Sequence, residues 1–137
     1  MEAKGSSAET VDQEDSWTLG REAEKARTHG LFLAHVCTKS HRPGQKFEAY
    51  IFIVRHIRNS DAPQKVGFDD VSKVEFYFGE AWGHKVFSVK NLGDNALGVK
   101  THAYGTFLAI CKITFQNSAS PPVVVNRYID HEMSGGA

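Results

Sequence analysis

The chain has 137 residues, of which 41% are hydrophobic and 23% charged, and these values suit one globular domain. Sixteen Lys and Arg balance sixteen Asp and Glu, so the formal net charge is zero. Nucleic acids and anionic membrane surfaces both select for a clustered positive excess, so neither is an expected partner. The start resembles no signal peptide, and no apolar run reaches the roughly 18 residues of a spanning helix. We therefore expect a cytoplasmic protein, or a nuclear one in a eukaryotic host.

Residues 1–28 are polar and acidic, and we expect them to form a disordered or weakly helical arm. Ser16 could cap a helix, but Trp17 with two alanines provides only a thin apolar stripe. Gly20 weakens such a helix by about 1 kcal/mol relative to Ala. The folded domain is expected at 29–133, followed by a short tail at 134–137.

From residue 31 onward, apolar residues recur with period two, and turn residues separate the apolar segments. This pattern predicts seven strands, at 31–37, 47–55, 74–78, 86–89, 97–101, 107–115 and 123–129. The segment 47–55 is apolar on both faces, which predicts a central strand covered on both sides. Since no convincing helix separates these strands, we do not expect a parallel α/β sheet. The expected fold is an all-β, immunoglobulin-like β-sandwich of about seven to eight antiparallel strands.

The two cysteines, Cys37 and Cys111, lie inside strand-like apolar segments. This position favours two buried free thiols and a reducing compartment. A disulfide between the two sheets of a sandwich remains the alternative.

No motif in the sequence recommends an enzyme. Seven histidines are present, but none has the spacing of a metal-binding pair, and no nucleophile elbow or phosphate-binding glycine loop occurs. We therefore expect no catalytic residue, no metal and no cofactor. A His-dependent enzyme or metal protein that uses His84 and His102 is retained as an alternative.

The informative residues are aromatic side chains in two loops. Trp82 lies between glycines in residues 79–84, and Tyr104 precedes a glycine in residues 101–107. A Trp in a loop either packs against the sandwich end or binds a ligand, and sandwich loops commonly carry binding sites. The candidate ligand-binding residues are Trp82, Gly83, His84, His102, Tyr104, Gly105 and Phe107.

Several short motifs follow one another in the order seen in a known family. They are the Val-Arg pair at 54–55, the strand 74–78, the loop residues 79–82 and 103–107, Ile-Thr-Phe-Gln-Asn at 113–117, and Pro-Pro-Val-Val-Val-Asn-Arg-Tyr at 121–128. On these motifs, residues 47–131 resemble the YEATS domain, and more closely its divergent prokaryotic members.

The resemblance implies a non-catalytic sandwich that binds a ligand with its loops. In eukaryotic members, two loops hold an acylated lysine side chain between aromatic walls, which would be Trp82 and Tyr104 here. The family's His and Ser, which hydrogen-bond the acyl amide, correspond to Gly79 and Ala81, and the first glycine of the second motif corresponds to Ala103.

Three functions are compatible with these observations. The first is a binding or sensor module whose aromatic loop pocket takes an acylated lysine or another small flat ligand. The second is a protein-interaction or adaptor module without a ligand pocket, as the resemblance implies for prokaryotic relatives near TIR-domain effectors. The third is the His-dependent enzyme or metal protein. The expected partner is a protein, with or without a modified lysine, or a small ligand.

Overall fold

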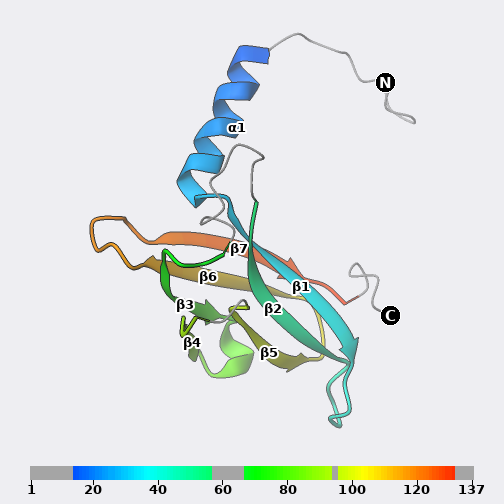
Figure 1. Ribbon diagram of the computed structural model, residues 1–137. Coiled ribbons are helices and arrows are strands. Elements are labelled where there is room, and N and C mark those ends of the chain that lie inside the picture. Colours follow the sequence, from blue (N-terminus) through cyan, green and yellow to red (C-terminus); the bar gives the residue numbers. More distant parts are fainter. Residues whose placement is uncertain (1–13, 57–66, 94–95, 132–137) are drawn as a thin grey trace, which may run out of the picture.

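The computed structural model describes residues 14–56, 67–93 and 96–131, and in this part of the chain about half of the residues lie in strands (Figure 1). The elements are α1 (Glu14–Thr28), β1 (Leu31–Lys39), β2 (Phe47–Arg55), β3 (Val71–Tyr77), the 3-10 helix η2 (Glu80–Trp82), β4 (Val86–Lys90), β5 (Gly98–Ala103), β6 (Phe107–Phe115) and β7 (Val123–Ile129). No helix in the described ranges is long and apolar enough to cross a membrane.

The strands form two antiparallel sheets that pack face to face (Figure 1). One sheet has the order β1-β2-β5, and the other has the order β4-β3-β6-β7. All paired neighbours are antiparallel. The predicted all-β sandwich is therefore confirmed, and all seven predicted strands are present.

The core lies between the sheets and follows from the period-two pattern of the strands. In β2, alternate residues are buried, and in β6 the same alternation places four residues inside. Because alternate side chains point to one face, each strand contributes a row to the core. The fully buried large side chains are Phe47, Phe76, Leu31, Ile51, Leu97, Ile113, Ile129, Val71, Val74 and Cys111.

The strand 47–55 is central in its sheet, as predicted, but it is covered on one side only. Its inner residues are buried, while Tyr50, Phe52 and Val54 on the other face are only half-buried. No described helix or strand lies over that outer face, and Figure 1 shows α1 rising beyond the end of the sandwich. The expectation of cover on both sides is thus wrong for the described part of the chain.

Both cysteines are buried and neither forms a disulfide, as expected. Burial raises the pKa of the Cys111 thiol from 9.0 to about 12, with a smaller contribution from the negative charge of Glu75. The thiolate is the nucleophilic form of cysteine, so Cys111 is chemically inert at neutral pH.

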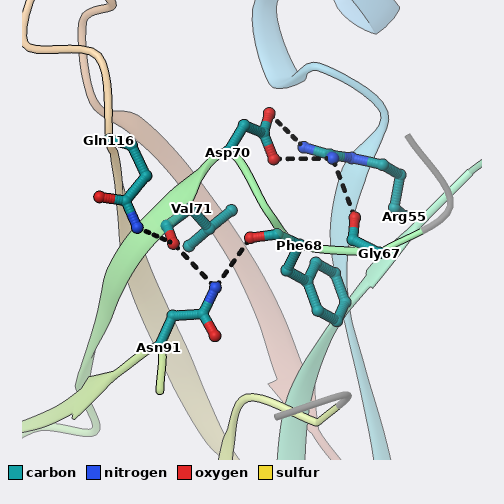
Figure 2. A network of polar contacts seen from close by, with 7 residues as sticks. All are labelled: Arg55, Gly67, Phe68, Asp70, Val71, Asn91 and Gln116. Atoms are coloured by element: carbon teal, nitrogen blue, oxygen red, sulfur yellow. Dashed lines mark hydrogen bonds and ion pairs between the residues drawn. The ribbon is translucent and has the colours of Figure 1, made fainter. Parts of the chain in front are cut away.

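One cluster of polar contacts ties the end of β2 to the segment that leads into β3 (Figure 2). The Arg55 side chain, 8% exposed, donates to both carboxylate oxygens of Asp70 at 2.9 and 3.0 Å. It also donates to the Gly67 carbonyl at 3.1 Å. Bidentate pairs of this kind fix orientation as well as distance. Arg55 is the last residue of β2, and Asp70 immediately precedes β3. Because these strands belong to different sheets, the ion pair joins the sheets at one end of the sandwich.

The side chain of Asn91, the residue after β4, also holds the start of β3 in place (Figure 2). Its amide nitrogen donates to the carbonyls of Phe68 and Val71, at 2.8 and 2.9 Å. Gln116 donates to the same Val71 carbonyl at 3.3 Å. A β-bulge between Val71 and Lys73 interrupts the period-two pattern here, so the strand begins three residues before the predicted segment 74–78.

Residues 14–28, part of the arm expected to be disordered or weakly helical, form the continuous helix α1. Two surface ion pairs one turn apart, Lys25 with Glu22 and Arg27 with Glu24, support it locally. Arg27 also donates to the carbonyl of Val124 in β7 at 3.1 Å, which attaches the helix to the sandwich. The first part of the expected arm, residues 1–13, and the expected tail, residues 134–137, lie outside the described residues.

The helix ends where the backbone turns left-handed at His29 and Gly30, with φ values of 55° and 77°. The Gly30 amide donates to the carbonyl of Lys25 at 3.2 Å, the bond of a Schellman-type end. A Cβ at Gly30 would lie 2.8 Å from the carbonyl oxygen of His56. Both the conformation and the space therefore require glycine.

Replacing Gly30 by Ala tests this joint. We expect Gly30→Ala to lower the free energy of unfolding by about 2–4 kcal/mol, because a left-handed Ala costs about 1 kcal/mol and backbone must also move. Gly44→Ala is the matched control, since Gly44 has φ of 79° and no atom within 4 Å of the position that a Cβ would take. Its expected loss is about 1 kcal/mol. Urea unfolding followed by circular dichroism measures both, and equal losses would contradict the steric argument.

Candidate functional site

The loop between β3 and β4 folds back on itself through two glycines. Gly79 has φ of 112°, and Gly83 has φ of 66°, so the backbone on either side of η2 takes conformations that favour glycine. The carbonyl of Gly79 accepts from the amides of Trp82 and His84, at 3.2 and 3.3 Å. This tight turn holds the indole of Trp82 toward the sandwich rather than toward solvent.

Trp82 is half-buried and packs against the core. Its ring centroid lies 5.5 Å from that of Phe78 and 4.6 Å from that of Phe107. Its indole N–H donates to the hydroxyl of Thr101 at 2.7 Å. Thr101 belongs to β5 in the three-stranded sheet, while Phe78 and Phe107 belong to the other side of the sandwich. Trp82 therefore joins the two sheets, at the end of β2 opposite Arg55.

The aromatic cluster at this end extends beyond Trp82. Phe78 also contacts Phe87 and Phe107, with ring centroids 5.5 and 5.4 Å apart. We call Phe78, Trp82, Phe87 and Phe107 the end cluster. Edge-on and offset ring contacts of this kind add to the stabilisation that burial provides.

Tyr104 differs from Trp82 in its surroundings. It lies in the bend between β5 and β6, and its side chain is 65% exposed. Among the described residues, no ring contact joins Tyr104 to Trp82. The two loops nevertheless share one end of the sandwich, because β3 ends and β6 begins there: Tyr77 pairs with Ile110. At this end of the sandwich, the half-buried ring of Trp82 in the end cluster therefore lies near the exposed ring of Tyr104 on the neighbouring loop.

The two candidate histidines have separate partners. His84, exposed and with φ of 59°, shares a hydrogen bond of 2.7 Å between its Nδ1 and the Tyr77 hydroxyl. His102 shares a bond of 2.9 Å with the Ser40 hydroxyl, and its Nε2 lies 3.1 Å from a carboxylate oxygen of Glu48. Within the described ranges, no three His, Cys, Asp or Glu side chains gather in a way that could hold a metal ion. The geometry thus provides no support for a catalytic pair or metal centre built from His84 and His102.

A cavity of about 1080 Å³ lies elsewhere in the molecule. It is open on one side and is lined by α1 together with residues at the joint of β1 and β2, including Leu31 and Arg55. Because Leu31 pairs with Arg55 while Phe47 pairs with Ala103, this cavity and the end cluster lie at opposite ends of β2. None of the predicted site residues lines it.

Residues 47–130 match the family model of the prokaryotic YEATS domain, which covers more than half of the chain. The chain belongs to this family. The resemblance seen in the sequence motifs is therefore confirmed. No curated protein sequence matches this YEATS domain significantly.

Two solved structures are similar to this YEATS domain in fold. One, titled "The Yaf9 YEATS domain Recognizing H3K122suc Peptide", is 12% identical, covers 77% of this chain and 73% of its own, and has a TM-score of 0.58. The other, the crystal structure of the yeast AF-9 homolog protein Yaf9, is 18% identical, covers 72% of this chain and 62% of its own, and has a TM-score of 0.51. At these identities the similarity establishes the sandwich fold, but it does not identify a ligand.

The structure also identifies residues of the site that sequence reasoning missed. Thr101 receives the indole hydrogen bond, and Phe78 and Phe87 complete the end cluster. The alternation of β3 and β4 gave a signal for the two phenylalanines as inward-facing residues. No local signal marks Thr101, because its partner Trp82 lies 19 residues earlier, in the loop between β3 and β4.

Substitution of Trp82 tests its part in joining the sheets. We expect Trp82→Ala to lower the free energy of unfolding by about 2–4 kcal/mol, because it removes the ring contacts and leaves a gap in the end cluster. Trp82→Phe keeps much of the packing and should cost about 1–2 kcal/mol, mainly through the unpaired Thr101 hydroxyl. Chemical denaturation followed by circular dichroism measures each loss.

The other tryptophan provides the control. Trp17 in α1 is 71% exposed, so Trp17→Ala should change the free energy of unfolding by no more than about 0.5 kcal/mol. A loss for Trp82→Ala as small as that for Trp17→Ala would show that the indole does not hold the sheets together.

Proposed function

We propose that this YEATS domain is a non-catalytic binding module that takes a modified lysine side chain of a partner protein at the loops that carry Trp82 and Tyr104. The observation that carries the proposal is the exposed ring of Tyr104 on the loop beside the half-buried end cluster. Family membership supports the same kind of partner, and so does the fold shared with the Yaf9 YEATS domain, which recognises an H3K122suc peptide.

The chemistry of an acylated lysine suits such a surface. Acylation removes the ammonium charge and leaves a flat amide on a long apolar stem, which gains dispersion contacts against aromatic rings. The partner segment itself can be recognised without charge attraction, in keeping with the zero formal charge of the chain. Tyr104 would form the exposed wall and Trp82 the floor.

The first loop differs from the eukaryotic pattern in a way that affects affinity. Gly79 and Ala81 occupy the positions of the hydrogen-bonding His and Ser, and neither has a side-chain donor. Hydrogen bonds to an amide are worth about 0.5–1.5 kcal/mol each, so their loss weakens binding several-fold. We therefore expect affinities in the range of about 10 µM to 1 mM, supplied mainly by aromatic contacts.

The alternative is an interaction or adaptor module without a ligand pocket. The packing of Trp82 favours it, because an indole already bonded to Thr101 and stacked on Phe107 is occupied as a structural plug. The two functions predict different effects of the acyl group on affinity. A pocket that has Tyr104 as one wall binds acylated lysine more tightly than free lysine, whereas an interaction surface binds both equally.

Titration calorimetry with matched peptides separates these functions. The peptides carry one lysine that is free, acetylated, crotonylated or succinylated, in an otherwise identical sequence. We expect saturable binding of at least one acylated form, with at least about tenfold weaker binding of the free lysine.

Tyr104→Ala is the variant to compare, and we expect it to weaken acyl-peptide binding at least about tenfold while leaving thermal stability unchanged. Trp17→Ala is its control, since Trp17 is an aromatic residue that is 71% exposed on α1, beyond the opposite end of the sandwich. No binding of any acylated peptide to the folded protein, or equal binding of free and acylated lysine, would contradict the proposal and favour the interaction module.

A further inference from the structure

The two sheets also meet along one side of the sandwich, where the edge strands β1 and β7 lie next to each other. These strands belong to different sheets, and in the described part of the chain no ladder of backbone hydrogen bonds joins them. We call the line along which they meet the β1-β7 seam. Contacts between side chains therefore decide how firmly this side of the sandwich is closed.

Each of these two strands has a polar residue at an inward position of the seam. Alternate residues of β1 point toward the core, and His35 is a half-buried polar residue in that row. In β7, the exposed residue Arg127 interrupts the inward row in the same way. The buried residues of the two rows are Leu31, Leu33, Cys37, Val123, Val125 and Ile129. Period-two patterning would place apolar side chains at 35 and 127, so the sequence departs from it at two positions that contact each other.

The imidazole of His35 bonds to β7 and to the residue that follows it through its two ring nitrogens. The Nε–H of Arg127 donates to Nδ1 of His35 at 2.7 Å. The Nε2 of His35 lies 3.4 Å from the backbone carbonyl oxygen of Asp130. A guanidinium can only donate and a carbonyl oxygen can only accept. The imidazole in this contact is therefore neutral, with its hydrogen on Nε2 and a lone pair on Nδ1.

Protonation of His35 is incompatible with this contact. A hydrogen on Nδ1 would point at the Nε–H of Arg127, so two donors would face each other without an acceptor, and both side chains would be positively charged. Burial lowers the pKa of His35 from 6.5, and the charge of Arg127 lowers it further, whereas the carbonyl and the carboxylate of Asp130 act in the opposite direction. The neutral form is thus the one that the folded domain favours.

The charges that act on His35 come from one side of β1. They are Arg127 of β7 and Asp130, which follows β7. On the other side, β2 places Ile51 opposite His35, and the inward residues next to Ile51 are buried and apolar. The other titratable side chains around this contact are the buried thiols Cys37 of β1 and Cys111 of β6, and His131, which stacks on Phe47. The protonation of His35 is therefore coupled chiefly to its own burial and to the position of Arg127.

We propose that His35 and Arg127 form a pH-sensitive clasp on the β1-β7 seam, which is closed while the imidazole is neutral and released when the imidazole takes up a proton. Just below pH 6.5 the unfolded chain binds this proton more readily than the folded domain does. The contribution of the clasp to stability is therefore complete above pH 6.5 and is lost as the pH falls below that value. Since the clasp uses neither Trp82 nor Tyr104, it is independent of the peptide binding proposed for the loops.

Urea unfolding of the full chain, followed by circular dichroism at about pH 7.5 and about pH 5.5, tests the clasp. We expect the urea midpoint to fall at the lower pH. His35→Asn keeps an oxygen that can accept from Arg127 but cannot take up a proton, so this variant should lose at least about half of that fall. His41→Asn is the matched control, because His41 is exposed in the turn between β1 and β2, and it should keep the whole fall.

NMR titration of the original chain provides a second measurement that needs no variant. The ring resonances of His35 should titrate with a midpoint below pH 6.5, and the Nε–H resonance of Arg127 should shift with the same midpoint, because the two groups share one hydrogen bond. A His35 midpoint at or above pH 6.5, or an Arg127 resonance that does not follow it, would overturn the proposal. A fall in the urea midpoint that is as large in His35→Asn as in the original chain, or that His41→Asn reduces equally, would also overturn it.

Discussion

Every other feature of the molecule depends on the register of β2, because a shift by one residue would exchange its buried and its outward-facing side chains. In the observed register, Phe47 and Ile51 enter the core, while Tyr50 and Phe52 form the aromatic centre of the outer face. The same register places Ala103 beside the first residue of β2, and so sets where the loop of Tyr104 begins. One strand thereby positions the core, the end loops and the outer face.

The two sheets are joined at both ends by polar contacts that sit beside apolar packing. At one end, Arg55 binds Asp70 through two hydrogen bonds, and at the other, the indole of Trp82 binds the hydroxyl of Thr101. Hydrophobic burial between the sheets is not directional, so it does not by itself fix how they are aligned. The directional contacts supply this alignment. The end that holds Trp82 is therefore held rigid, beneath a loop whose Tyr104 is exposed to solvent.

Much of the fold could be predicted from the sequence because strands are encoded locally, by period-two patterning and turn residues. Three predicted strands, 47–55, 107–115 and 123–129, have the bounds that the structure shows. The predicted bounds of the other four strands differ from the observed bounds. The ends of these strands are decided by contacts with residues far along the chain. β3 starts early because a bulge after Val71 breaks the alternation, and β5 continues to Ala103 because it pairs there with Phe47. The length of α1 also exceeded what its weak apolar stripe indicated.

The candidate site was less predictable, since whether a loop Trp faces solvent or core depends on partners far along the chain. The sequence left both possibilities for Trp82 open, and its contact with Thr101 decides that the ring is half-buried. The apolar outer residues of 47–55 indicated cover on both sides, but no described element provides it.

The central claim, that the loops with Trp82 and Tyr104 receive a modified lysine, is tested most directly by backbone-amide NMR during titration with an acylated-lysine peptide. The account predicts shifts concentrated in residues 79–84 and 101–107, and none of similar size when the lysine is unmodified. Shifts confined to residues outside these two loops, such as those that line the cavity beside α1, would contradict it, and so would the same shifts with free lysine.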